Sequence, residues 1–199
     1  MKNSFRIDFT IDDILYEYDE KSILNINIPH QISSNVAHPF YGVISQSANI
    51  QLVDKDKIIF SILNESANHS GYLDIYFNDI NIAHLKMDNI EYNLEDGILN
   101  MQFKDDLYKL QNKRSKSYSF GTKISLYQII NTIYSDTIRV IGNYSMDIDE
   151  ATTTLLNEMI INCGYVENDT YWNMWNKICE CGLLVVYIES NKFCIRRII

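Results

Sequence analysis

Hydrophobic and polar residues alternate through most of the first half of the chain, which is typical of β-strands. The pattern is strongest between residues 71 and 110, where Leu, Ile and Phe occupy every second position of residues 73–77. Turn signals at Asn78 and at residues 94–97 separate this run from two further ones. The stretch therefore predicts an antiparallel meander of three or four strands.

The same alternation occurs before the meander, so the amino-terminal region is expected to contain about eight short strands. Residues 58–63 fit either a strand or a short helix. Strands of this number and spacing are typical of an antiparallel β-barrel or β-sandwich. The other alternating runs are residues 5–9, 14–18, 23–28 and 48–53.

Helical periodicity replaces the alternation after a polar stretch at residues 111–119. Ser125 followed by Gln128 has the spacing of a capping box, and the hydrophobic residues after it recur at helical positions. Gly164 and Gly182 are expected to stop the later helices. The other predicted elements are a short strand at 138–141, helices at about 150–162 and 170–182, and a hairpin at 183–198.

These patterns predict an α+β fold of two domains. Residues 1–112 are expected to form an antiparallel β-barrel or sandwich. Residues 113–199 are expected to form a smaller α/β lobe with three helices and a carboxyl-terminal β-hairpin. A length of 199 residues and a hydrophobic content of 46% are sufficient for such cores.

Charge and hydropathy exclude several classes of function. The formal charge of −9 repels a phosphate backbone, so we expect no sequence-independent binding to nucleic acid and no sequence-specific site. No apolar run is long enough to span a membrane. Residues 2–14 lack the apolar core of a signal peptide, so the chain is expected to be cytosolic when made.

Four cysteines lie near the carboxyl end, which suggests a metal or disulfide site: Cys163, Cys179, Cys181 and Cys194. Structural zinc sites usually contain C-x₂₋₄-C pairs, whereas this chain has one C-x-C pair and no histidine after the first cysteine. The pattern favours small buried residues in a reduced protein. His30 and His38 have no metal-ligating neighbour at helical spacing and are expected to be exposed in a loop.

Two charged clusters could be ion sites. The acidic run at residues 147–150 offers oxygen ligands to a hard cation, but it lacks the Gly that an EF-hand loop has at its sixth position, and the start of a helix explains the same residues. Lys113, Arg114 and Lys116 gather in the polar stretch, where a solvated loop explains them better than an anion site. We therefore assign no metal-binding or cofactor-binding residues.

No catalytic motif is recognisable in the sequence. There is no G-x-S-x-G, no H-E-x-x-H and no Gly-rich phosphate loop, although a pair of carboxylates for glycoside hydrolysis remains an alternative in an acidic chain. Tyr171, Trp172 and Trp175 could form a sugar-stacking platform. Their helical spacing favours a stripe that faces a core. We assign no catalytic residues and expect that the chain is not an enzyme.

Three stretches are similar to parts of a known protein family. They are residues 43–54, then residues 72–77 with the D-x-L-x-x-L pattern of residues 105–110, and then residues 171–178 with Gly182 and residues 185–188. The last stretch looks like a W-x-x-L-x-x-I helix followed by a hairpin. In this order they resemble the hub-type proteins at the centre of phage tail tips and baseplates, a group that includes the late-control protein D family.

The resemblance implies a structural protein of the virion tail that assembles in the host cytoplasm. Copies of it would form a ring, usually a trimer, that joins the tail tube to a spike or fibre. Its partners would be itself and other tail proteins, namely the tube, the distal tail protein, and the spike or fibre. A negative surface would suit a ring around a DNA passage, because it would not trap the genome.

Two other functions are compatible with the sequence. A carbohydrate-binding or receptor-binding β-module of a phage tail is the alternative, because Tyr is abundant, with 14 residues. Loss of glycan binding on Trp172→Ala or Tyr76→Ala would favour it. A tail-associated hydrolase comes third.

Overall fold

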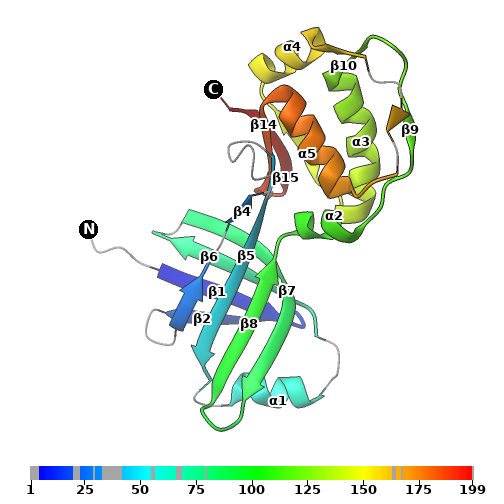
Figure 1. The fold of residues 1–199 in the computed structure, drawn as a ribbon. Coiled ribbons are helices and arrows are strands. Elements are labelled where there is room, and N and C mark those ends of the chain that lie inside the picture. Colours follow the sequence, from blue (N-terminus) through cyan, green and yellow to red (C-terminus); the bar gives the residue numbers. More distant parts are fainter. Residues whose placement is uncertain are drawn as a thin grey trace. The chain divides into compact units, whose positions relative to one another are not determined.

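A computed structural model describes residues 5–19, 23–28, 30–32, 42–54, 57–65, 69–78, 80–162, 165–166 and 168–198. The chain divides into two compact units (Figure 1). Unit 1 comprises Met1–His30 and Gln46–Asp105, and unit 2 comprises Gln31–Ser45 and Asp106–Ile199. Strand β5 (Gly42–Val53) contributes residues 42–45 to unit 2 and residues 46–53 to unit 1. The division into domains at residues 112 and 113 stays a prediction.

In its described residues, unit 1 consists of an antiparallel sheet and a single helix. Besides β5, its elements are β1 (Phe5–Ile11), β2 (Ile14–Asp19), β3 (Ile23–Asn27), α1 (Ile58–Glu65), β6 (Gly71–Phe77), β7 (Ile80–Asn93) and β8 (Ile98–Lys104). The strands pair in the order β2-β1-β6-β7-β8-β5, and β3 pairs with β5. A short strand, β4 (His30–Ile32), also pairs with β5. The predicted meander is confirmed as β6, β7 and β8.

Of the two predicted forms, a barrel or a sandwich, the barrel is wrong, because the sheet does not close. In the part of the chain that the structure describes, β2 pairs with β1 alone and β3 pairs with β5 alone, so the sheet keeps two open ends. The sheet is strongly curved. Two strands separate β1 from β8, and yet the ring centroids of Phe9 on β1 and Phe103 on β8 lie only 5.5 Å apart. Alternation determines which side chains enter the core but not which strands pair, so it does not distinguish open from closed sheets.

Helix α1 forms because the carboxylate of Asp54 caps it. The Oδ1 atom accepts from the backbone N–H of Ile58 at 3.0 Å, and Oδ2 accepts from that of Phe60 at 3.1 Å. Ile59 is completely buried and packs into the core of unit 1. The ambiguous run at residues 58–63 is therefore a helix that closes part of this core.

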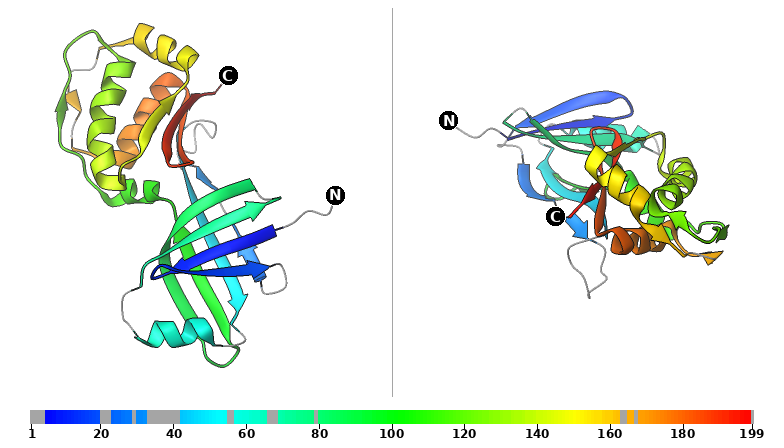
Figure 2. Two further views of the ribbon diagram at one scale, coloured as in Figure 1. Left: turned by 180° about the vertical axis from the view of Figure 1, so that it is seen from behind. Right: turned by 90° about the horizontal axis from the view of Figure 1, so that it is seen from above.

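Unit 2 packs helices against a mixed sheet. Its first elements are η1 (Asp106–Tyr108), α2 (Lys109–Asn112), β9 (Tyr118–Ser119), β10 (Ile124–Ser125), α3 (Leu126–Ile141) and β11 (Ser145–Ile148). The others are α4 (Glu150–Glu158), β12 (Ile160–Ile161), β13 (Tyr165–Val166), α5 (Tyr171–Gly182), β14 (Leu184–Glu189) and β15 (Lys192–Arg197). Helices α3 and α5 lie together on one side of the β14–β15 hairpin (Figure 2).

The sheet of unit 2 runs in the order β11-β15-β14-β5. The hairpin β14–β15 is antiparallel, whereas β11 pairs parallel to β15 and residues 42 and 43 of β5 pair parallel to β14. The hairpin was predicted correctly. Strand β11 was not among the predicted elements, because its pairing depends on a strand almost fifty residues further along the chain.

Capping residues set the starts of α3, α4 and α5. Ser125 and Gln128 form the predicted capping box of α3, Asp149 caps α4 and Thr170 caps α5. The predicted strand at 138–141 is wrong, because α3 continues to Ile141 and stops at Gly142, whose φ of 119° leaves the helical region. Helix α4 ends earlier than predicted, at Glu158.

Candidate functional site

The aromatic residues of α5 belong to the core of unit 2. Trp175 is completely buried, its Nε1–H donates to the hydroxyl of Thr137 at 2.9 Å, and its ring lies 4.9 Å from that of Phe193. Tyr171 is also buried, whereas Trp172 is half-buried. The core-facing stripe is thus confirmed. The sugar-stacking platform of these three side chains is wrong, because two of its members are inaccessible.

The acidic run at residues 147–150 starts a helix and forms an ion pair. Asp149 accepts hydrogen bonds from the backbone N–H and the hydroxyl of Thr152 at 2.8 and 2.7 Å, which lowers its pKa. The side chain of Asp147 accepts from the guanidinium of Arg196 at 2.6 Å, which lowers the pKa of Asp147. Within the described ranges, no group of three or more His, Cys, Asp or Glu side chains is placed to hold a metal ion.

Two of the four cysteines are buried as predicted. Cys179 and Cys194 are buried free thiols, and burial raises the pKa of each. Cys181 is exposed, so the prediction is wrong for this residue, which lies on the solvent side of α5. Cys163, His38 and the side chain of His30 lie outside the described residues.

The basic cluster after α2 is an exposed segment with specific partners. Lys116 contacts Asp136 of α3 at 2.7 Å, and this hydrogen bond lowers the pKa of Asp136. Arg114 forms an isolated β-bridge with Thr170. Lys113, Arg114 and Lys116 are all exposed, as a solvated loop predicts.

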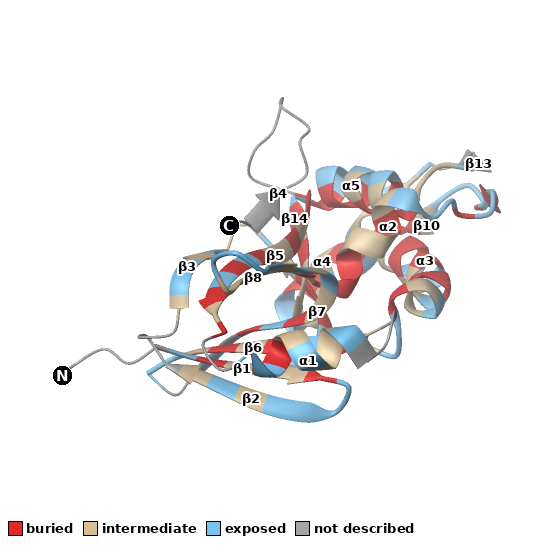
Figure 3. Ribbon diagram, turned by 90° about the horizontal axis from the view of Figure 1, so that it is seen from below, coloured by how far each residue is buried: buried red, intermediate tan, exposed pale blue. Residues whose placement is uncertain are grey.

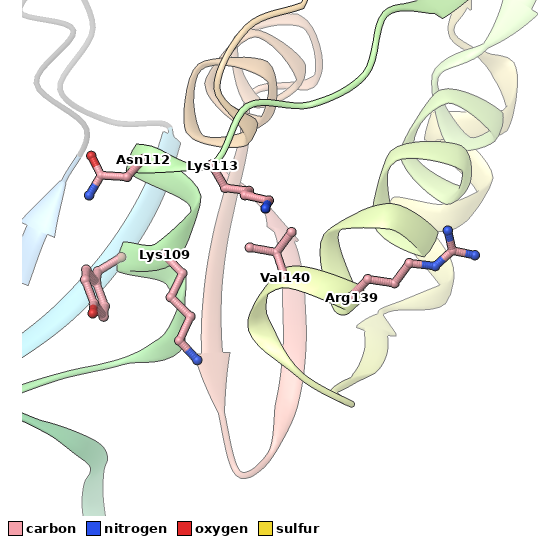
Figure 4. A pocket seen from close by; sticks show the side chains of 6 residues that line it. Lys109, Asn112, Lys113, Arg139 and Val140 are labelled. Atoms are coloured by element: carbon pink, nitrogen blue, oxygen red, sulfur yellow. The ribbon is translucent and has the colours of Figure 1, made fainter. Parts of the chain in front are cut away.

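A positively charged hollow of about 410 Å³ lies in unit 2 between α2 and the end of α3 (Figure 4). Lys109 and Lys113 contribute its cationic groups, whereas Arg139 lines it with the guanidinium pointing away from the two lysines (Figure 4). Lys109 also contacts the buried carboxylate of Asp106 at 2.6 Å, and Arg139 contacts Asp136 at 3.3 Å. The sequence did not predict this hollow, because Arg139 was placed on a strand. The remaining lining residues are Tyr108, Asn112 and Val140.

Among the described residues, strand β2 pairs on one side only and forms an open edge of unit 1 with exposed hydrophobic residues. Ile14 and Leu15 are 53% and 56% exposed, and most of β2 is drawn as exposed or intermediate in Figure 3. The turn before β2 is fixed by Asp12, which accepts from the backbone N–H of Ser70 at 3.0 Å and lies 2.7 Å from the ring nitrogen of His69. The edge is therefore held in place and offers backbone groups that can pair with another strand.

A second hollow, of about 370 Å³, lies on unit 1 and is lined by amide side chains. Asn25 of β3, Asn49 and Gln51 of β5, and Asn100 and Gln102 of β8 surround it, together with Ile50 and Met101. The sequence shows these residues as the polar half of the alternating pattern. Their convergence depends on strand pairing and was not predicted.

No protein-family model matches the sequence, and no curated protein matches it. Among solved structures, the fold is similar to that of the 43 kDa tail protein of prophage MuSo2 from Shewanella oneidensis, with a TM-score of 0.59 at 8% identity. This match covers 98% of the present chain and 54% of the other chain.

Two further tail proteins share the fold. A tail protein from Neisseria meningitidis MC58 has a TM-score of 0.59 at 6% identity, covering 96% of this chain and 50% of that one. The prophage tail protein gp18 from Listeria monocytogenes has a TM-score of 0.58 at 10% identity, covering 98% and 50%. The chain thus has the mixed α+β fold found in these tail proteins and spans about half of their length.

None of the helices in the described ranges is both long and apolar enough to cross a membrane.

Proposed function

We propose that the chain is a structural component of a phage tail tip or baseplate hub, in which copies of it form a ring that joins the tail tube to a spike or fibre. The observation that carries this proposal is the similarity of fold over 98% of the chain to two prophage tail proteins from different bacteria. The likeness covers both units, so it does not rest on a single motif.

The open edge of β2 supports a role in assembly. Exposed sheet edges pair readily with strands of other chains, and the hydrophobic side chains of Ile14 and Leu15 would become buried in such a contact. In a ring, the same contact would repeat between each copy and the next. We propose a trimer, with the tube, the distal tail protein and the spike or fibre as further partners.

The charge distribution supports contacts between copies as well. The chain carries 26 acidic and 17 basic residues, and yet Lys109, Lys113 and Arg139 line one hollow. An acidic surface of a neighbouring copy would complement this hollow. The overall negative charge would keep the inner surface of a ring from binding DNA as it passes.

In this proposal the chain acts through non-covalent contacts with other chains and catalyses no reaction. Its place is the tail of the virion, after assembly in the host cytoplasm. Immunogold electron microscopy with antibodies against the purified chain tests this location on phage particles whose genome encodes it. We expect gold at the tail end that lies away from the head. Gold on the head, or on no particle, would contradict the proposal.

A further inference from the structure

The outward face of unit 1 carries two rows of amide side chains that cross several strands. In the first row, Asn27 lies opposite Asn49, which lies opposite Gln102, which lies opposite Asn89. In an antiparallel sheet, side chains at directly opposite positions point to the same face. The first row therefore presents an amide on each of β3, β5, β8 and β7.

The second row runs beside the first. Asn25 lies opposite Gln51, Gln51 lies opposite Asn100, and the row ends at Glu91 on β7. Neighbouring positions are spaced about 4.8 Å across strands and about 6.8 Å along a strand, so the two rows form a regular grid. Five of these amides line the hollow of about 370 Å³, and Glu91 lies outside it.

The hollow is uncharged and offers both kinds of hydrogen-bonding group. Ile50 and Met101, which complete its lining, are each 1% exposed, so their side chains point into the core and the open surface belongs to the amide side chains, which contribute methylene carbons as well as polar groups. Each amide provides two N–H donors and one carbonyl acceptor. The bond from Nε2 of Gln51 to Oδ1 of Asn100, at 2.9 Å, uses one donor and one acceptor of this set. The exposed side chains of Asn25, Asn49 and Gln102 direct further groups to solvent.

This chemistry determines which ligand fits. A phosphate or carboxylate would need a cationic partner, which the lining of the hollow lacks. An apolar ligand would leave the amide groups of the lining without hydrogen-bonding partners. An extended peptide pairs with the edge of a sheet, whereas this hollow lies on a face. Hydroxyl groups both donate and accept, and they match neutral amides at regular spacing.

We propose that the amide hollow of unit 1 binds an uncharged saccharide chain. The amides of β5 and β8 hold the hydroxyls of one sugar unit. The members of the two rows that lie on β3 and β7 extend the contact to the sugar units on either side. This inference goes beyond a role in tail assembly and does not depend on it, because a single chain contains the whole grid.

Native gel electrophoresis of the full chain through gels that contain one soluble polysaccharide each tests the proposal. The neutral probes are dextran, yeast mannan and laminarin, and the anionic probe is polygalacturonate. We expect slower migration in at least one neutral gel. The double variant Gln51→Ala/Asn100→Ala should lower the association constant about tenfold, because it removes hydrogen-bonding groups from the centre of the hollow.

Asn157→Ala is the matched control, since Asn157 is an exposed amide of α4 in unit 2, outside the grid and outside the charged hollow. Its migration should equal that of the unchanged protein. Gln102→Ala provides a second variant with a smaller loss, should the double variant not fold. Normal migration in all three neutral gels, slower migration only in polygalacturonate, or equal binding by the unchanged protein and a folded grid variant would overturn the proposal.

Discussion

The indole of Trp175 shows how the surroundings of a single residue decide its role. A sugar platform requires an accessible ring, whereas this ring is completely buried and its N–H donates to Thr137. The helical spacing in the sequence was sufficient to favour the core position. The acceptor was not predictable, because Thr137 lies on another helix and 38 positions earlier in the chain.

Thr137→Val should destabilise unit 2 through this hydrogen bond. The variant keeps the shape of the side chain but leaves the buried N–H of Trp175 without the hydroxyl, which costs about 1–3 kcal/mol. Thr132→Val is the control, because each hydroxyl donates to the carbonyl four residues earlier, but Thr132 is exposed whereas Thr137 is buried. Urea unfolding should show a change below about 0.5 kcal/mol for the control. Equal losses in both variants would contradict this role.

Asp169 should make the free energy of unfolding depend on pH in the acidic range. Hydrogen bonds from Lys177, and then from Asn173, lower its pKa from 3.8 to about 2. The pKa of Asp169 is lower in the folded state than in the unfolded state. The stabilisation is therefore fully present when the pH is above the pKa of the unfolded state, and it is lost as the pH falls through the pKa of the folded state.

The variant Asp169→Asn tests this dependence. The unchanged protein should be more stable than the variant near neutral pH, and the difference should shrink between about pH 4 and about pH 2. Urea unfolding of both proteins across this range measures it. A difference that is constant with pH would show that the carboxylate charge does not contribute.

Helices and strands were predictable where local signals set them. The capping box at Ser125 and the cap at Thr170 are both readable from sequence, because the side chain and the N–H that it binds are three residues apart. The end of α3 was missed, since Val140 and Ile141 favour strands locally but continue the helix that packs on the core of unit 2. Strand β11 and the amide grid depend on distant partners and leave no local signal.

Gly71→Ala should weaken the pairing of β1 with β6. A Cβ atom at Gly71 would lie 2.4 Å from the backbone oxygen of Thr10, so one of the two strands would have to move. We expect a loss of about 1–3 kcal/mol in the free energy of unfolding. Gly121→Ala is the control, because a Cβ atom there meets nothing within 4 Å. Thermal unfolding that is unchanged in both variants would show that the strands adjust freely.

The whole molecule shares its fold with phage tail proteins at identities of 6 to 10%. At this level the likeness lies in the order and packing of elements. The sequence resemblance rested on the spacing of hydrophobic residues over the same regions, and this spacing predicted the class of fold. The open sheet and the charged hollow were not predictable, because both depend on which segments meet.

Charge reversal in the hollow of unit 2 should weaken association between copies. Lys113→Glu would place an acidic group where an acidic neighbour is proposed. The dissociation constant of the assembly should rise about tenfold, and it should depend much less on salt concentration than that of the unchanged protein. Lys123→Glu makes the same change of charge at another exposed site of unit 2. Sedimentation velocity at several concentrations compares the two. Equal effects would assign the change to net charge alone.

The mass of the purified chain in solution tests the proposed ring most directly. Light scattering coupled to size-exclusion chromatography should give a closed assembly, a trimer of about 70 kDa for a chain of 23.3 kDa, with a mass that stays constant over a range of concentrations. A single chain at high concentration, or a mass that rises without limit, would contradict the ring.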